Sequence, residues 1–279
     1  MSGIVKRPLV SVLMPTFNRA GCVSKAIESV IAQSFRDWEF IIIDDASTDE
    51  TPAILKTWRG KDQRIIYIKN KENSQPDISK ILNQGLALAK GKYIARIDDD
   101  DWWRNSDKLK TQVDFLEANP DYVVCGGGMI VVDSQGLELF RYLKPESDSD
   151  IRKTALLANP FSHTTVVFLK EAAEKVGGYG DWQYAEDWDL WLKLGKIGKF
   201  YNFPEYFTTY IMSGGNKSFI YQRPHSKMIL EIIKKHRFDY PRFYFGYYFN
   251  LGQYLYSFLP LILRKGLHPT LSYLKRSLF

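Results

Sequence analysis

Strand-like and helix-like runs alternate from residue 9 to residue 97, and this alternation constrains the fold more than any other feature of the sequence. Short β-branched and aromatic runs bounded by turn residues predict strands, and the amphipathic runs between them predict helices. The predicted strands are residues 9–15, 38–44, 64–69 and 93–97, and the predicted helices are residues 22–34, 50–58 and 78–91. Strands that alternate with helices pair in parallel, so we expect an α/β fold with a mostly parallel sheet flanked by helices.

Three of these predicted strands end in residues that could bind a ligand. They are followed by Pro15-Thr16-Phe17, by Asp44-Asp45 and by the four aspartates 98–101. Because open α/β sheets bind ligands outside the carboxyl ends of their strands, we expect these three groups to meet at one site.

The four consecutive aspartates, Asp98 to Asp101, are the strongest chemical signal in the chain. Adjacent carboxylates raise one another's pKa unless a cation or solvent offsets the charge, and their oxygens suit Mg²⁺ or Mn²⁺ bound together with a diphosphate. A solvated acidic turn that caps the next helix is the alternative. The second carboxylate pair at a neighbouring strand end favours the ligand site, and the sequence has no G-x-G-x-x-G or Walker motif.

The second half of the sequence is less regular. We expect a helix over residues 106–119 with Ser106 as its N-cap, and an apolar glycine-rich segment over 122–132. A strand over 164–169, a helix that begins near Glu186 and a strand near 207–211 are also predicted.

Four motifs occur in a fixed order along the chain. They are "VSVLMPTFNR", "SVIAQSFRDWEFIIIDDASTDET", "ISKILNQGLALAKGKYIARIDDDD" and "YAEDWDLWLKL". In this order and spacing they resemble the family 2 glycosyltransferases, over about residues 10–218. The resemblance implies a GT-A type, Rossmann-like sheet in a domain of residues 1–220, with a nucleotide-sugar half of about 1–105 and an acceptor half of about 106–220. A helical, aromatic and basic extension would follow over 221–279.

The resemblance also implies roles for matching positions. Nucleotide-sugar contacts are expected from Pro15, Thr16, Phe17, Asp44, Asp45, Lys80, Asn83, Asp98 and Asp99. Asp98 and Asp100 form the favoured D-x-D pair for Mn²⁺ or Mg²⁺, with Asp100 as the direct ligand. The register stays open by one residue because Asp99 occupies the variable position, and Asp101 is expected to support the loop.

Glu186 and Asp187 match the position of the catalytic base in the resembling family, and Asp187 is the favoured residue. In an inverting transfer a carboxylate takes the proton of the acceptor hydroxyl while that oxygen attacks the anomeric carbon, and the metal stabilises the leaving diphosphate. The alternative is that these acids only complement the dipole at the start of a helix. His163, Trp102, Trp182 and Tyr184 are weaker candidates for the acceptor pocket, with simple packing as the alternative for His163 and Trp102.

The resemblance predicts transfer of one sugar from a nucleotide-diphosphate sugar, with UDP favoured, to a glycan or lipid-linked acceptor in cell-surface polysaccharide or glycoconjugate synthesis. The Q-x-x-R-W motif of processive synthases is absent, which favours single-sugar transfer. A sugar-phosphate nucleotidyltransferase and a non-catalytic carbohydrate-binding protein are the competing hypotheses. No nucleic-acid partner is expected.

The net charge of +6 is concentrated after Arg223, where aromatic and basic residues recur. This tail either lies in an anionic membrane interface or packs on the catalytic domain or a second subunit. Its most apolar piece, residues 247–263, is short and interrupted for a spanning helix. The sequence begins without an apolar targeting run, so we expect a cytoplasmic protein, with the inner face of the cell membrane as the place of any peripheral contact.

Overall fold

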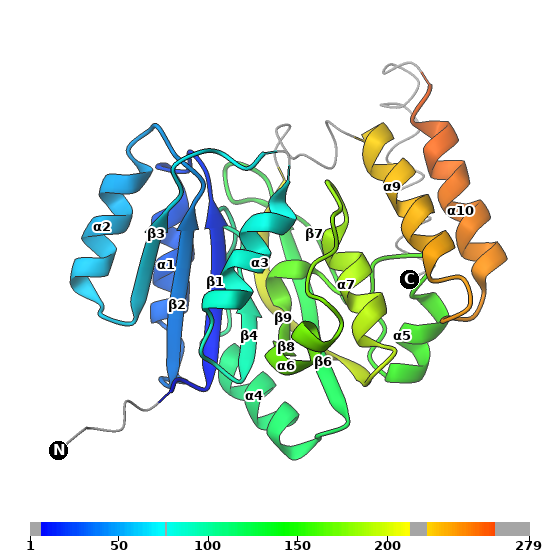
Figure 1. The fold of residues 1–279 in the computed structure, drawn as a ribbon, viewed down its shortest axis with the longest axis horizontal. Helices are drawn as coiled ribbons and strands as arrows, with labels where there is room; N and C mark the ends of the chain where they lie inside the picture. Colours follow the sequence, from blue (N-terminus) through cyan, green and yellow to red (C-terminus); the bar gives the residue numbers. More distant parts are fainter. Residues whose placement is uncertain (1–6, 76, 213–221, 260–279) are drawn as a thin grey trace.

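The computed structural model describes residues 7–75, 77–212 and 222–259. A single mixed sheet organises the fold (Figure 1), with the strand order β3-β2-β1-β4-β8-β6-β9-β5 and with β7 paired to β6. The strands are β1 (Val10–Thr16), β2 (Trp38–Asp44), β3 (Ile65–Lys69), β4 (Tyr93–Arg96), β5 (Trp102–Trp103), β6 (Tyr122–Val132), β7 (Glu138–Tyr142), β8 (Val167–Leu169) and β9 (Lys199–Ile211). The helices are α1 (Val23–Ile31), α2 (Thr51–Lys61), α3 (Ile78–Leu88), α4 (Lys108–Ala118), α5 (Asp148–Thr154), α6 (Lys170–Lys175), α7 (Glu186–Leu194), α9 (Gln222–Lys235) and α10 (Phe243–Tyr256), and a 3-10 turn covers His163–Thr165.

The first half of the sheet is parallel, as the alternation of strands and helices predicts. β1 pairs in parallel with β2 and β4, and β2 pairs in parallel with β3. All seven residues of β2 are buried, because helices cover both faces of the sheet at this strand. The carboxyl ends of β1, β2 and β4 therefore lie at one edge, which places the three predicted ligand-binding groups beside one another.

The second half of the sheet mixes parallel and antiparallel pairs. β8 runs antiparallel to both β4 and β6, so it joins the two halves, and β6 pairs in parallel with β9. The predicted strand over 164–169 is shorter in the structure, since His163–Thr165 forms a 3-10 turn and only Val167–Leu169 pairs. The predicted strand near residue 207 is the end of β9.

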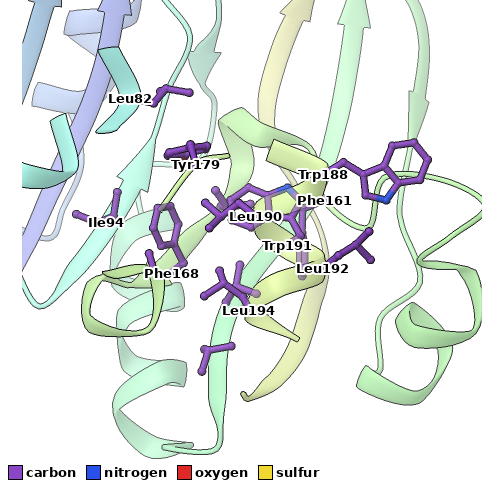
Figure 2. Close-up of a cluster of buried hydrophobic side chains, with 14 of the residues drawn as sticks. Leu82, Ile94, Phe161, Phe168, Tyr179, Trp188, Leu190, Trp191, Leu192 and Leu194 are labelled. Carbon is purple, nitrogen blue, oxygen red and sulfur yellow. The ribbon is translucent and has the colours of Figure 1, made fainter. Parts of the chain in front are cut away.

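Alternate residues of each central strand point into two separate cores. On β1, Val12 and Met14 pack with the helices α1, α2 and α4, whereas Leu13 packs with α3, α6 and α7 on the other face. Figure 2 shows the centre of the second core, where Trp191 of α7 meets Phe161 and Phe168 edge to face. We call this second cluster the α7-side core.

The helices α9 and α10 pack on each other and stand beside α5 and α7 in Figure 1. Ile229, Ile232 and Ile233 of α9 belong to the α7-side core. No helix within the described ranges is long and apolar enough to cross a bilayer. Residues 214–216, a Gly-Gly-Asn run that is typical of a turn, and the tail beyond residue 259 lie outside the described residues.

One predicted helix cap is wrong by one residue. Ser106 is the N-cap that the sequence predicts, but in the structure Asp107 is the N-cap, α4 begins at Lys108, and the N-cap side chain makes no capping hydrogen bond. Asp107 instead accepts a short hydrogen bond from Ser34, and the Ser34 amide donates to the Ser106 carbonyl. This contact with the loop after α1 determines where the helix begins.

Candidate functional site

The acidic loop 98–101 follows β4 and is held by two arginines. Arg96, buried at the end of β4, donates from Nη2 to Asp98 Oδ1 at 2.6 Å. Arg19, in the loop after β1, pairs with Asp99 at 3.1 Å and with Asp100 at 3.4 Å. The loops after β1 and β4 are thereby joined. Sequence reasoning missed Arg96, although a charged residue inside an otherwise apolar strand is a signal that could have found it.

Burial makes this loop resist full ionisation. It raises the pKa of Asp99, and together with the charges of Asp98 and Asp99 it raises the pKa of Asp100 to about 6. Burial also raises the pKa of Asp101 well above the ordinary aspartate value. A bound cation would offset this crowding of negative charge.

Asp98 and Asp100 are the carboxylates that solvent reaches, whereas Asp99 and Asp101 are buried. Within the described ranges no three or more Asp, Glu, His or Cys side chains form a metal cage. Mg²⁺ and Mn²⁺ commonly use only one or two protein carboxylates together with substrate phosphates, so the exposed pair fits an ion that arrives with a diphosphate. Direct contact of Asp100 with the ion, together with Asp98, stays a prediction.

The end of β2 carries the second acidic pair. Asp44 is buried and accepts hydrogen bonds from the Ser47 amide at 2.8 Å and the Tyr67 hydroxyl at 3.0 Å, so it holds its own loop. Asp45 accepts from the Ser74 amide at 2.9 Å, and its own amide donates to the carbonyl of Thr16 at the end of β1. The loops that follow β1 and β2 therefore meet, as expected for a nucleotide site built at strand ends.

The remaining predicted nucleotide contacts differ in their surroundings. Phe17 donates its amide to Asp99 at 3.4 Å, next to Pro15 and Thr16. Lys80 is largely exposed and pairs with Asp77 at 3.1 Å. The Asn83 side chain donates from Nδ2 to the Tyr179 carbonyl and accepts at Oδ1 from the Tyr179 amide, each at 2.9 Å. These two bonds connect α3 to the segment before Glu186.

Glu186 and Asp187 lie in the first turn of α7. The apolar side chains that follow them in this helix belong to the α7-side core. Asp187 accepts from Asn159 Nδ2 and from the Trp188 amide, each at 2.8 Å. Burial raises the pKa of both acids, and with the Asp187 charge it brings the pKa of Glu186 to about 8. Two donors stabilise the ionised form of Asp187, and the charge of Asp187 in turn opposes ionisation of Glu186. Asn159 is a further residue that the sequence did not identify.

The acidic loop and the α7 acids belong to one site. The charge of Asp98 contributes to the raised pKa values of Glu186 and Asp187, although these residues lie far apart in the chain. Burial raises the pKa of Tyr179, and the charges of Glu186, Asp187 and Asp98 raise it further. Tyr210 of β9 has its pKa raised by burial and then by the charges of Asp101, Asp100 and Asp98, so β9 borders the same site.

His163 contacts Tyr179, in the segment before the α7 acids. Its Nε2 lies 2.8 Å from the Tyr179 hydroxyl, and its ring meets the Trp191 ring edge on. Burial, followed by the charge of Arg96, holds the pKa of His163 well below its usual range, so the ring is neutral. A neutral, hydrogen-bonded imidazole can orient Tyr179 beside the α7 acids.

The other predicted pocket residues lie around the acidic loop and the segment before α7. The Lys25 ammonium lies 3.2 Å from the centre of the half-buried Trp102 ring. The Trp182 carbonyl accepts from Ser79 at 3.1 Å, and the Tyr184 ring meets the His225 ring of α9 at 6.1 Å between centres. A role in acceptor binding stays a prediction for each.

Three of the loops described above contain a non-glycine residue with positive φ. Asn18 follows β1, Ala46 follows Asp45, and Ala185 precedes Glu186, with φ values of 53°, 64° and 60°. Such left-handed residues are costly outside glycine and cluster at functional sites, where the surrounding contacts hold them in place.

Comparison with known proteins identifies the family. The family model for Glycosyl transferase family 2 matches residues 11–177, which is more than half of the chain. The chain belongs to glycosyltransferase family 2. It is 37% identical over 203 residues to the putative glycosyltransferase EpsE of Bacillus subtilis, covering 71% of each chain. It is 33% identical over 196 residues to the GalNAc(5)-diNAcBac-PP-undecaprenol beta-1,3-glucosyltransferase of Campylobacter jejuni, covering 70% of this chain and 62% of that protein.

Solved structures support the fold. The mannosyltransferase PcManGT of Pyrobaculum calidifontis, in complex with GDP-Man and Mn²⁺, superimposes with a TM-score of 0.66 at 18% identity, over 98% of this chain and 83% of that one. The chain therefore has the GT-A glycosyltransferase fold that the sequence motifs predict, followed by the helices α9 and α10.

Proposed function

We propose that this chain is an inverting, metal-dependent glycosyltransferase that moves one sugar from a nucleotide-diphosphate sugar to a glycan or lipid-linked acceptor. The observation that carries the proposal is the placement of two acidic groups around one region: Asp98 and Asp100 on the loop after β4, and Asp187 on α7. The Asp98 amide lies 3.5 Å from Thr164 Oγ1, next to the His163 ring that contacts Tyr179, and the charge of Asp98 contributes to the raised pKa of Asp187. One group suits a diphosphate with its cation, and the other suits a proton acceptor.

In this proposal Asp187 is the general base. The hydrogen bonds from Asn159 and the Trp188 amide favour its ionised form, whereas burial and the charge of Asp187 favour the protonated form of Glu186. Asp187 would take the proton of the acceptor hydroxyl as this oxygen forms a bond to the anomeric carbon and the bond to the diphosphate breaks.

Asp100, with Asp98, would hold Mn²⁺ or Mg²⁺. The ion, when bound, supplies positive charge to the departing diphosphate. The solved relative in complex with GDP-Man and Mn²⁺ supports a divalent ion at this fold. The nucleotide half of about residues 1–105 would bind the donor through the loops after β1 and β2, and the acceptor half of about residues 106–220 would bind the second substrate.

The test is a screen of UDP- and GDP-sugars for Mn²⁺-dependent binding by calorimetry, followed by measurement of nucleotide release with candidate acceptors. We expect Asp100→Ala to weaken Mn²⁺-dependent donor binding, and Asp187→Asn to abolish transfer while donor binding persists. Asp114→Asn, an exposed aspartate on α4 paired with Lys110, is the matched control and should change neither. Normal turnover by Asp187→Asn would refute the base assignment, and pyrophosphate release from a nucleoside triphosphate with a sugar phosphate would favour the nucleotidyltransferase instead.

The acceptor would be presented at a membrane. The Campylobacter relative is named for an undecaprenol-linked acceptor. Exposed large apolar side chains occur between α9 and α10, on α10 and just after it: Phe238, Tyr244, Phe245, Tyr248, Leu255 and Phe258. Arg237 lies 4.3 Å from the Phe238 ring and Arg223 4.1 Å from the Phe258 ring, so cations accompany the aromatics. Aromatic and basic residues together favour the interface of an anionic bilayer, here the inner face of the cell membrane.

Flotation with vesicles of phosphatidylglycerol and phosphatidylcholine tests this surface. We expect the folded chain to float, and a Phe238→Ser/Tyr244→Ser double variant to remain in the dense fraction. Leu137→Ser, which removes another largely exposed apolar side chain, from the loop between β6 and β7, is the control and should float. Failure of the intact chain to float would refute membrane contact.

A further inference from the structure

Asp189, two residues after Asp187 on α7, is fully buried and bonded to the end of α9. Its Oδ1 accepts from Lys235 Nζ at 2.8 Å and lies 2.9 Å from His236 Nε2. Burial opposes the charged form of Asp189, but the hydrogen bonds from His236 and Lys235 outweigh it and hold its pKa well below the ordinary value. A buried carboxylate with such partners fixes the part of α7 that carries it.

The segment that follows α9 is itself anchored to α7 at a second point. Asp239 Oδ2 lies 3.1 Å from His236 Nδ1, so the imidazole is held between two carboxylates. The Tyr240 hydroxyl donates to the Leu192 carbonyl at 2.8 Å, near the C-terminal end of α7. His236 therefore contacts the half of α7 that contains the proposed base, and Tyr240 contacts the other half.

The α9–α10 pair also supports the other side of Asp187. Asn250 of α10 donates to the carbonyls of Leu156 and Leu157, at 3.3 and 3.2 Å. These residues lie three and two positions before Asn159, whose side chain donates to Asp187. The two helices thus hold both the helix that carries the proposed base and the loop that carries its hydrogen-bond donor.

The first turn of α7 needs such support. It follows Ala185 at a φ of 60°, a conformation that costs about 1–2 kcal/mol for a residue with a Cβ. A helix of nine residues is also marginal without tertiary contacts. The position of the Asp187 carboxylate therefore depends on the contacts that other segments make with α7.

We infer that His236 is a positioning residue for sugar transfer: through Asp189 it fixes the first turn of α7 and so places the Asp187 carboxylate against the acceptor hydroxyl. The inference rests on the proposed role of Asp187 as the base. It gives the C-terminal helices a part in the chemistry, in addition to any contact with a membrane.

The test compares His236→Ala with Tyr240→Phe, since each variant removes one hydrogen bond between the same segment and α7. Hydrogen exchange of the peptide 180–192 measures how well the backbone amides of α7 are protected, and it needs no substrate. We expect His236→Ala to speed exchange at residues 186–190, and Tyr240→Phe to leave these amides protected. With the donor found in the nucleotide-sugar screen, we expect kcat to fall about ten- to a hundredfold in His236→Ala with unchanged donor affinity, because small displacements of a catalytic group have effects of this size.

Two further variants distinguish positioning from a general loss of stability. Adding His236→Ala to Asp189→Asn should lower kcat no further than Asp189→Asn alone, because the two residues act through one contact. His236→Gln, whose amide can still donate to Asp189, should restore part of kcat.

Each outcome has a definite meaning. Equal exchange at residues 186–190 in His236→Ala and Tyr240→Phe would overturn the inference, as would faster exchange with unchanged kcat. If the wild-type chain transfers no sugar while exchange responds as expected, the proposed function fails and the hold of His236 on α7 stands.

Discussion

The hydrogen bond from Asn159 to Asp187 makes a quantitative prediction about the pH dependence of transfer. Asn159 Nδ2 lies 2.8 Å from Asp187 Oδ2, and burial already raises the pKa of this carboxyl. This hydrogen bond stabilises the ionised form of Asp187, so Asn159→Ala removes an interaction that opposes the effect of burial on the pKa. We expect the pKa of Asp187 to rise further.

The size of the shift follows from the strength of the bond. A hydrogen bond to a charged group contributes about 1.5–3 kcal/mol, and 1.36 kcal/mol corresponds to one pKa unit, so the shift should be about one to two units. Asp187 is the base only when ionised, hence activity rises with pH through its pKa. The acid limb of kcat/KM should move to higher pH by this amount, while the rate on the plateau above it stays close to that of the wild type.

The assay measures release of the nucleoside diphosphate at each pH, with the donor identified by the screen. Asn159→Asp should move the limb further than Asn159→Ala, because a second carboxylate would then face Asp187. Asn119→Ala removes an amide that donates to the Phe115 carbonyl at the end of α4, and it should leave the limb in place. An acid limb at the same pH in Asn159→Ala and the wild type would show that the limb does not belong to Asp187.

Three further predictions concern stability and donor binding. A Cβ at Gly91 would lie 2.5 Å from the Ser11 backbone nitrogen, so Gly91→Ala should lower the free energy of unfolding by about 1–3 kcal/mol, and an unchanged melting temperature would contradict this. Asp189→Asn should lower the free energy of unfolding by about 2 kcal/mol at neutral pH. Because the folded-state pKa of Asp189 is depressed, this contribution is complete above the unfolded value of about 4 and is lost as the pH falls below it, so denaturant melts of the two proteins should converge in acid. Asp45→Ala should weaken nucleotide-sugar binding about ten- to a hundredfold by calorimetry, and equal affinity would remove Asp45 from the donor site.

The first half of the fold could be predicted because its signals are local. The strands of the parallel part are mostly apolar runs, and the polar residues after β1, β2 and β4 converge because parallel strands end at one edge. The second half depends on long-range pairing: β8 is only three residues long, and its place between β4 and β6 follows from the register of distant strands.

The residues that hold the acids in place could not be predicted from the sequence either, because their contacts are also long-range. Asn159 reaches Asp187 across 28 residues, and His236 reaches Asp189 across 47, with no pattern in the sequence that links either pair. Glu186 and Asp187 themselves could be identified from the motif that contains them. Motifs thus predict the reacting groups, whereas only the folded chain shows which residues hold those groups in place.

The left-handed alanines at positions 46 and 185 have a consequence for engineering this enzyme. Glycine would adopt either backbone conformation with about 1 kcal/mol less strain. Selection for thermostability alone would therefore favour glycine at both positions. The same substitutions would free the backbone beside Asp45 and Glu186. A library built for thermostability should therefore hold these alanines constant and look for its gains at the exposed positions of helices α2 and α4.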